Sequence, residues 1–274
     1  MIFPSLSLAQ RLERHDLWNS QEHIRTQAQL YPETGAVTLP IGGGLAVFAG
    51  VKAPLSGLYG LGLWEPVTPA HLDGAEAFFH SRGAKMEMEV EICPFADASF
   101  ARLLMRRGYT IHDYMNTYVR ETDGLIPEPY LPPGANMRTA TVEEARQWYE
   151  IKGEGGDWAE PDGISFMLIR TVQKADTQLF MIWMDGQPVS AGALEMHEGV
   201  AALMAASTLP AYRGRGLQTA LLQARLSAAK AAGCDLVLVH SRPGTVSQRN
   251  ILRTGFQLVY TNIDLRKVTV VLHF

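Results

Sequence analysis

The clearest pattern of apolar and polar positions lies between residues 217 and 231. The apolar residues recur at the i, i+3, i+4 and i+7 spacing of a helix face that packs on a core, at Leu217, Ala220, Leu221, Ala224, Ala228 and Ala231. The polar residues mostly fall outside this stripe, at Gln218, Gln223, Arg225 and Lys230. The pattern predicts a long amphipathic helix that begins near Leu217, shortly after Pro210.

Short apolar runs before and after this helix predict strands. Three runs, at residues 179–184, 188–196 and 200–208, are joined by two glycine-containing turns and are expected to form hairpins. A fourth run at residues 234–240 follows the helix. This alternation is typical of an α/β unit.

Further helices are predicted around these strands. Residues 141–144 have the sequence of a capping box, which opens a helix that reaches about Lys152. Another helix is predicted over residues 160–171, and a short one ends at Gly255-Phe256.

The first half of the chain ends with the same order of elements as the second. A helix over residues 71–82 is followed by an alternating strand at 86–93 and by a helix that ends at Gly108, before a final strand. We interpret the shared order as a tandem duplication of one α/β unit. Coincidence is the alternative, because a helix that ends at glycine is a common C-cap.

A proline-rich segment separates the two halves. Residues 127–133 contain four prolines, which can neither continue a helix nor lie inside a sheet. Residues 123–134 are therefore predicted to be an interdomain linker. The predicted domains are residues 1–122 and 135–274.

Composition and charge narrow the classes of function. Of the 274 residues, 47% are hydrophobic and 19% charged, which suits two buried cores. The net charge of −4 gives no basic footprint for nucleic acid. No signal peptide and no apolar run of about 18 residues that could span a membrane is recognised. Cys93 and Cys234 are interpreted as buried thiols, so we expect a cytoplasmic protein without a metal site.

The segment with the clearest chemistry joins the strand that ends near Thr208 to the long helix. Residues 213–218 read Arg-Gly-Arg-Gly-Leu-Gln. A glycine-rich turn between a strand and a helix directs backbone N–H groups and the positive end of the helix dipole at one point, which favours a phosphate group. Glycine leaves room for the anion, and Arg213 and Arg215 add positive charge. Walker and Rossmann signatures are absent, so a nucleotide-binding module is a remote alternative.

Two segments resemble one known family. Arg213-x-x-Gly216 resembles the core of the Gln/Arg-x-x-Gly-x-Gly/Ala signature of the GNAT N-acetyltransferase superfamily, with Gln218 at the last position. Residues 247–256 resemble the closing helix of that family and its Gly-Phe ending. One helix and one strand separate the two matches, as in the family, and together they cover nearly all of residues 135–274.

This resemblance implies an α/β (α+β) fold of two tandem GNAT-like domains, each with a mixed, mostly antiparallel central sheet flanked by helices. The first domain is expected to be a degenerate copy. Its counterpart of the glycine loop, residues 61–69, lacks the arginine and the second glycine, and contains Glu65, Pro66 and Pro69.

The resemblance also implies acetyl-CoA as co-substrate. Main-chain amides of residues 213–218 would hold its pyrophosphate. The end of the preceding strand would hydrogen-bond the pantetheine arm and place an N–H beside the thioester carbonyl as an oxyanion hole. The residues expected to bind acetyl-CoA are Ser207, Thr208, Leu209, Arg213, Gly214, Arg215, Gly216, Leu217, Gln218, Thr219, Ser247 and Asn250.

Three residues are candidates for catalysis. Transfer to an amine needs a group that accepts a proton, and His240 and Glu195 are candidates for it. Many family members carry a proton-donating tyrosine where this chain has Ile251. Tyr260, or Asn250 through water, is considered as a replacement, and unassisted departure of the thiolate is the alternative. For His240 the alternative is a capped or solvent-facing histidine at a strand end, and for Glu195 it is a position on the solvent face of a half-buried strand.

The acceptor is predicted to be a primary amine of a small molecule or a protein, acetylated by direct transfer in a ternary complex. Asp157 and Trp158, in a glycine-rich loop, are expected to bind the cationic amine; an ordinary solvated turn is the alternative. A homodimer is left open. The alternative function from another class is a catalytically silent acyl-CoA sensor or scaffold.

Overall fold

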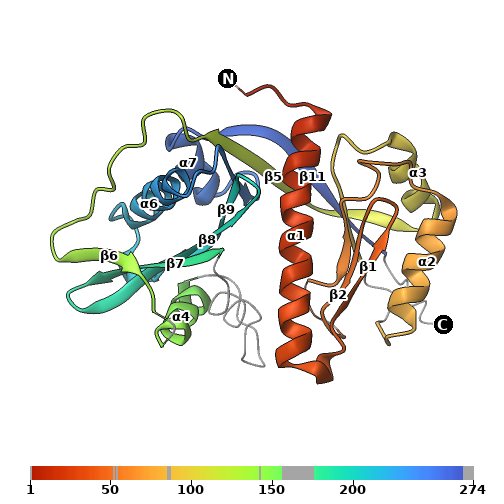
Figure 1. The fold of residues 1–274 in the computed structure, drawn as a ribbon, viewed down its shortest axis with the longest axis horizontal. Helices are drawn as coiled ribbons and strands as arrows, with labels where there is room; N and C mark the ends of the chain where they lie inside the picture. Colours follow the sequence, from red (N-terminus) through yellow and green to blue (C-terminus); the bar gives the residue numbers. More distant parts are fainter. Residues whose placement is uncertain are drawn as a thin grey trace, which may run out of the picture. The chain divides into compact units, whose positions relative to one another are not determined.

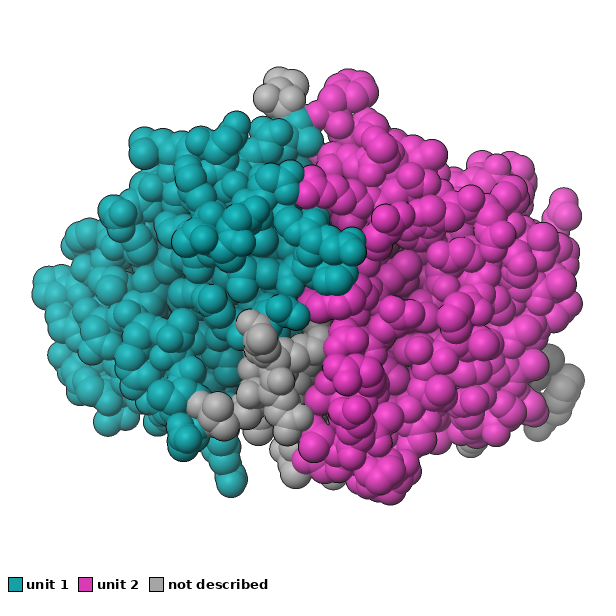
Figure 2. All heavy atoms as spheres, in the orientation of Figure 1, with its two compact units in different colours: residues 1–2, 117–258 teal, residues 3–116, 259–274 magenta. Residues whose placement is uncertain are grey.

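The chain forms two compact units, shown in Figure 1 and in separate colours in Figure 2. The computed structural model describes residues 2–51, 53, 55–84, 88–141, 143–155 and 176–267, without the side chains of residues 152–155. Unit 1 consists of Met1–Ile2 and Thr117–Leu258, and unit 2 consists of Phe3–Asn116 and Val259–Phe274.

Unit 1 is built on a mixed, mostly antiparallel sheet with the strand order β5-β10-β9-β8-β7-β6. Its strands are the last residues of β5 (Tyr109–Glu121), β6 (Ala135–Thr139), β7 (Thr177–Met184), β8 (Gln187–His197), β9 (Val200–Thr208) and β10 (Leu236–Ser241). The two predicted hairpins are present. Their turns, Asp185-Gly186 and Glu198-Gly199, have positive φ at both positions, as a two-residue turn between twisted strands requires.

Helices cover both faces of this sheet (Figure 1). The predicted amphipathic helix is α6 (Leu217–Ala231), and it packs with α7 (Val246–Arg253) over one core, which includes Leu221, Leu226 and Ile251. On the other face, α4 (Ala145–Gly155) buries Trp148 against β7 and β8. The helix predicted over residues 160–171 lies outside the described residues.

The segment predicted to be a linker packs on unit 1. Ile126 and Leu131 lie against the core that α6 covers. Arg120 Nη2 donates to the carbonyl of Leu125 at 2.6 Å, and Lys230 Nζ donates to that of Gly124 at 3.2 Å. Although its prolines exclude regular structure, as predicted, the segment belongs to the surface of one unit.

Unit 2 has the strand order β1-β2-β3-β4-β11-β5. Its elements are α1 (Leu6–Leu30), η1 (Pro32–Thr34), β1 (Val37–Ile41), β2 (Gly44–Phe48), β3 (Gly57–Tyr59), α2 (Pro69–His80), β4 (Glu89–Ile92), α3 (Ala98–Arg106), the first part of β5, and most of β11 (Gln257–Lys267). The β3-α2-β4 segment has two parallel strands joined by a helix, which is also the arrangement of β9-α6-β10 in unit 1.

The two units differ from the predicted domains because two long strands are exchanged. In unit 2 the neighbour of β4 is β11, from the end of the chain, and residues 263–266 pair with β4 antiparallel. In unit 1 the neighbour of β10 is β5, from the first half. Each unit is therefore completed by a strand from the other half of the sequence, which a division at residues 123–134 does not reproduce.

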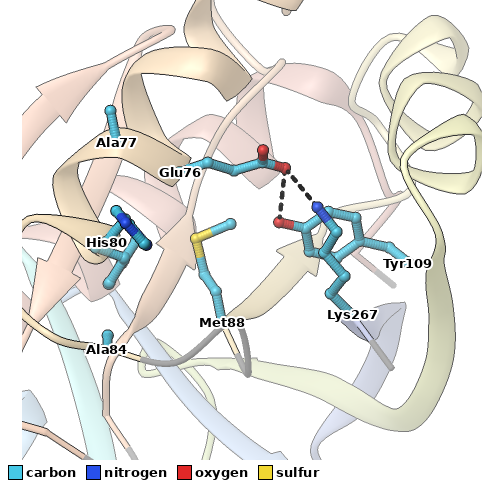
Figure 3. Close-up of a pocket in the computed structure, with 8 residues that line it drawn as sticks. Glu76, Ala77, His80, Ala84, Met88, Tyr109 and Lys267 are labelled. Carbon is cyan, nitrogen blue, oxygen red and sulfur yellow. Dashed lines mark hydrogen bonds and ion pairs between the residues drawn. The ribbon is translucent and has the colours of Figure 1, made fainter. Parts of the chain in front are cut away.

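Unit 2 contains a pocket of about 270 Å³ that is lined by residues of α2, β5 and β11 and by Ala84 and Met88, which lie between α2 and β4 (Figure 3). Its lining is mostly apolar and includes Phe79 and Met88. The Glu76 carboxylate on its wall accepts a hydrogen bond from the Tyr109 hydroxyl at 3.3 Å and lies 3.4 Å from Lys267 Nζ. The Glu76 carboxylate is thus paired with the Lys267 ammonium and hydrogen-bonded by Tyr109, in a different unit from the glycine loop.

Within the described ranges, no helix has the length and apolar character needed to cross a membrane.

Candidate cofactor and acyl-transfer site

The N-terminus of α6 presents backbone donors without an intrahelical partner. The first hydrogen bond within the helix runs from the Ala220 amide to the Gly216 carbonyl at 3.0 Å. The amides of Leu217, Gln218 and Thr219 precede it, and the N-cap residue, Gly216, has no side chain that could cap them. Three N–H groups and the positive end of the helix dipole therefore meet at one place.

Glycine is required here for backbone conformation. Gly214 has φ +76° and Gly216 has φ +81°, in the left-handed region that other residues rarely adopt. A Cβ added at either position would meet no atom within 4 Å, so open space lies beside the loop. An anion has room to approach the amides at this point.

Two exposed arginines flank the loop. Arg213 Nε donates to the Thr208 carbonyl at 3.2 Å, and Arg215 Nη2 donates to the Ala211 carbonyl at 3.4 Å. Both guanidinium groups are thus held next to the helix N-terminus. Main-chain donors, a helix dipole and two cations at one place are suited to a diphosphate.

Strand β9, which leads into this loop, contains a β-bulge. Ala191 of β8 is opposite Ser207, whereas Ala193 is opposite Met204, so β9 has one more residue than β8 between the two pairs. Ala205 in the bulge has φ +50°. A bulge interrupts the ladder and turns the strand, which redirects the groups that follow it.

Beside the bulge, β9 separates from β10. The two strands pair in parallel only at residues 200–202 and 236–238, although β9 continues to Thr208 and β10 to Ser241. An opening between two parallel strands therefore begins after Ala202 and Leu238. Strand backbone along such an opening can hydrogen-bond an extended ligand.

The predicted pantetheine-binding residues lie along this opening, and they differ in whether their hydrogen-bonding groups are already used within the protein. Ser207 is 6% exposed, and its hydroxyl has no hydrogen-bond partner among the described residues. The Thr208 hydroxyl lies 2.6 Å from that of Ser190, and the Leu209 amide donates to the Val189 carbonyl at 2.9 Å. Ser207 thus offers a buried, unused hydroxyl, whereas the Leu209 amide is already used by β8.

Sheet register places the two candidate bases on one face. Glu195, Ala202 and Leu238 form a row across three strands, and neighbours in a row point to the same face. His240 lies two residues beyond Leu238, so it shares that face, which is the one covered by α4. His240 Nδ1 is 3.2 Å from the Thr117 hydroxyl, and Glu195 is buried at 2% exposure.

Tyr260 lies in unit 2, whereas the glycine loop is in unit 1. Its hydroxyl donates to the Glu13 carboxylate at 3.1 Å. Burial and, after it, the negative charge of Glu13 raise the pKa of the phenol well above its usual value. Tyr260 and the glycine loop therefore belong to different units. Ile251, at the position of the family tyrosine, is 1% exposed in the core of unit 1.

Of the remaining predicted site residues, two lie in α7 and two lie outside the described residues. Ser247 is exposed in the first turn of α7, and Asn250 is half-buried in the same helix. Asp157 and Trp158 lie outside the described residues. Among the residues that the structure describes, no cluster of three or more His, Cys, Asp or Glu side chains is arranged to hold a metal ion.

Two polar residues near the bulge were missed in the sequence. Ser190 Oγ, fully buried, donates to the Ser207 carbonyl at 2.8 Å. Arg225, expected outside the apolar stripe of α6, is only 1% exposed. A signal for Arg225 was present, because it follows the buried Leu221 by four residues, the spacing of neighbours on one helix face.

Comparison with known proteins identifies a family for part of the chain. The model of the acetyltransferase (GNAT) family matches residues 141–256. No curated protein sequence matches the chain significantly.

Solved structures with the same fold cover most of the chain. A GCN5-related N-acetyltransferase from Kribbella flavida is 21% identical with a TM-score of 0.66, over 91% of this chain and 96% of that one. A second GCN5-related N-acetyltransferase, from Sphaerobacter thermophilus, is 20% identical with a TM-score of 0.60, over 72% and 66%. A tandem GNAT protein from the clavulanic acid biosynthesis pathway is 12% identical with a TM-score of 0.61, over 82% and 78%.

These structures share the mixed α/β fold with this chain, and the family match covers the glycine loop, the opening between β9 and β10, and α7. The similarity of this chain to the acetyltransferase (GNAT) family therefore lies in residues 141–256.

Proposed function

We propose that the protein transfers an acetyl group from acetyl-CoA to a primary amine of a small molecule or a protein, directly, in a ternary complex. The observation that carries this proposal is the N-terminus of α6, where Gly214 and Gly216 leave open space beside three unpaired helix-terminal amides. The CoA pyrophosphate accepts hydrogen bonds from these amides. Arg213 and Arg215 offset part of its charge.

The pantetheine arm extends along β9 into the opening beside β10. The unpartnered Ser207 hydroxyl and the strand backbone around the bulge supply its hydrogen-bond partners. A backbone N–H in this region points at the thioester carbonyl and stabilises the oxyanion that forms when the amine attacks. The sheet register supports this path, because β9 is no longer paired with β10 after Ala202 and continues into the loop. The family match, which covers both strands and the loop, supports it as well.

Proton transfer involves His240 in this proposal. The amine nitrogen attacks the thioester carbon, the C–S bond breaks, and the nitrogen loses a proton to His240, directly or through water. Because Ile251 has no proton to donate, His240 returns the proton to the leaving thiolate. Glu195 lies on the same sheet face and is the second candidate for accepting the amine proton.

Unit 2 is proposed to be a degenerate copy without a cofactor. Helix α2 occupies the same place in β3-α2-β4 as α6 does in β9-α6-β10. Its N-terminus is closed, because Thr68 Oγ1 accepts from the His71 amide at 3.3 Å and Pro69 has no N–H. The tandem GNAT relative supports a duplicated origin.

Replacement of Gly216 by aspartate tests the proposed cofactor site. Gly216→Asp places a carboxylate beside the helix-terminal amides and should lower CoA affinity at least about thirty-fold, because the amides are occupied and the anion is repelled. Isothermal titration with CoA measures this directly. Thermal shifts with CoA, ATP and NAD distinguish an acyl-CoA site from a nucleotide site, since only a ligand of the native state raises the melting temperature.

Gly233→Asp is the matched control. Gly233 ends the same helix, has the same φ of +81°, and a Cβ there also meets no atom within 4 Å. Both variants therefore carry similar backbone strain, and only Gly216→Asp should lose CoA. Equal binding by the two variants would place the cofactor elsewhere. Release of free thiol from acetyl-CoA with a panel of amines then separates the enzyme from a silent acyl-CoA sensor.

A further inference from the structure

Arg225 is a buried cation in the middle of α6. Its guanidinium donates three hydrogen bonds, all to main-chain carbonyls: Nε to Leu221 at 3.1 Å, and Nη1 to Ala193 at 3.0 Å and Met204 at 3.2 Å. Burial lowers its pKa to about 9, which still leaves the side chain charged near neutral pH. A buried charge is costly, so its retention at 1% exposure calls for a specific function.

The two strand carbonyls that Arg225 bridges lie at the bulge. Ala193 and Met204 are the last regular pair of β8 and β9 before the register shifts, and Ala205, next to Met204, has φ +50°. A bulge disturbs the ladder locally, and buried main-chain groups near it need well-placed hydrogen-bond donors. Arg225 donates to one carbonyl on each strand of this pair. It does so from α6, the helix whose first turn faces the proposed pyrophosphate.

Gly192 provides the space for this contact. A Cβ at Gly192 would lie 3.0 Å from Arg225 Cζ and 3.1 Å from Nη1, tighter than most Cβ contacts in proteins, so the guanidinium would have to shift. The Gly192 carbonyl also accepts a hydrogen bond from Trp148 Nε1 at 3.3 Å. Strand β8 is therefore held at the bulge by one side chain from α4 and one from α6.

We propose that Arg225 is a positioning residue for acyl transfer: by bridging the carbonyl oxygens of Ala193 and Met204, it holds the bulge of β9 in the shape that directs the groups beyond it toward pantetheine and the thioester. Because acetyl transfer at this site is itself proposed, this role rests on the proposed function. The contact between Arg225 and the bulge can be tested independently.

The affinities for two ligands distinguish this positioning role from a contribution to overall stability. Acetyl-CoA contacts both the pyrophosphate site and the strand, whereas 3′-phospho-ADP is the part of CoA that lacks pantetheine. Arg225→Met should weaken acetyl-CoA binding at least about ten-fold, as expected when one or two hydrogen bonds are misaligned, and leave 3′-phospho-ADP within about two-fold. Hydrogen exchange in the unliganded protein should become faster at residues 205–209.

Four further variants, of which the first is a control, complete the test. Lys230→Met removes a cation from an exposed position of the same helix and should change neither affinity. Gly192→Ala pushes the guanidinium away and should reproduce the selective loss of acetyl-CoA affinity. In the Arg225→Met background, Gly192→Ala should add less than about a two-fold further loss, because the two changes act on one contact. Arg225→Lys, which keeps the charge but not the planar fork, should be intermediate.

The outcomes are distinct. If the wild-type protein binds neither ligand, the proposed function fails, and the exchange rates at residues 205–209 still decide whether Arg225 holds the bulge. If Arg225→Met weakens both ligands equally, or changes neither affinity nor exchange, the positioning role is refuted. If Arg225→Met does not fold, Arg225→Lys and Gly192→Ala are judged by the same criteria.

Discussion

Among single residues, His240 shows how sheet register places a side chain at a site. Leu238 is the last residue of β10 that pairs with β9, and His240 follows where the strands have separated. The Thr117 hydroxyl, 3.2 Å from Nδ1, orients the ring. In the proposed mechanism this ring exchanges a proton with the amine, a role in which histidine is common.

Replacement of His240 by alanine should lower turnover far more than cofactor affinity. Loss of a general base typically reduces kcat by about 10²–10⁴-fold, whereas acetyl-CoA affinity should change less than about three-fold. The measurement is thiol release from acetyl-CoA with an amine that the wild-type protein acetylates, beside a titration with acetyl-CoA. Glu195→Gln is the parallel variant. Unchanged turnover in His240→Ala would remove this residue from the mechanism.

At the scale of elements, α4 begins later than predicted, and the contacts of Glu144 connect its start to a neighbouring strand. The capping-box sequence predicted a helix from Thr141, but α4 begins at Ala145. Glu144 Oε2 accepts from the Thr141 amide at 2.9 Å, and the same carboxylate bonds both Nη atoms of Arg138, at 2.5 and 2.6 Å. The acid therefore ties strand β6 to the helix start as well as capping it.

This arrangement predicts a pH-dependent contribution to stability. The Arg138 hydrogen bonds, and then the Thr141 amide, lower the pKa of Glu144 from 4.5 to about 2. A lowered folded-state pKa means that the contribution is present above the unfolded pKa and is lost as pH falls from about 4.5 to about 2. Glu144→Gln should therefore make the urea midpoint less sensitive to pH between about 5 and 3.

Glu150→Gln is the control for that measurement, because Glu150 is exposed and its ion pair is with Arg146, one turn away on the same helix. Its midpoint should follow that of the wild-type protein across the same pH range. An identical pH dependence in Glu144→Gln and the wild-type protein would contradict a role for Glu144 in acid stability.

At the scale of the whole molecule, the exchange of β5 and β11 links the two halves of the sequence. Leu265 in β11 is 3% exposed, pairs with Val90 of β4, and belongs to the core of unit 2. In the same strand, the Asn262 side chain donates to Glu13 of α1 at 3.2 Å. A unit made mainly of residues 3–116 therefore depends on the last strand of the chain.

Leu265→Ala should destabilise unit 2, although the position lies in the second half of the sequence. The expected loss is about 2–5 kcal/mol, as for other buried leucines replaced by alanine. Hydrogen exchange followed by mass spectrometry should become faster in peptides from residues 3–116 and stay unchanged in peptides from 135–258. Arg266→Ala, at an exposed neighbour, should have little effect. Faster exchange confined to residues 135–258 would contradict the assignment of β11 to unit 2.

Local features of the structure follow from the sequence because they depend on residues close together in the chain. The two hairpins need positive φ at Asp185-Gly186 and Glu198-Gly199, and helix α6 needs only its own apolar stripe and Gly216 before it. The anion binding proposed for the loop has the same local origin, since a strand, a glycine turn and a helix determine where the amides point.

Tertiary structure alone decided which strands are neighbours and which polar side chains are buried. An alternating strand has the same pattern whichever sheet it joins, so nothing in residues 257–267 indicates that β11 pairs with β4. For the same reason the sequence could not place Tyr260 in unit 2 beside Glu13. Arg225 is buried because a bulge in a distant strand supplies carbonyl acceptors for its guanidinium. The free energy of these hydrogen bonds comes from contacts between segments far apart in the chain.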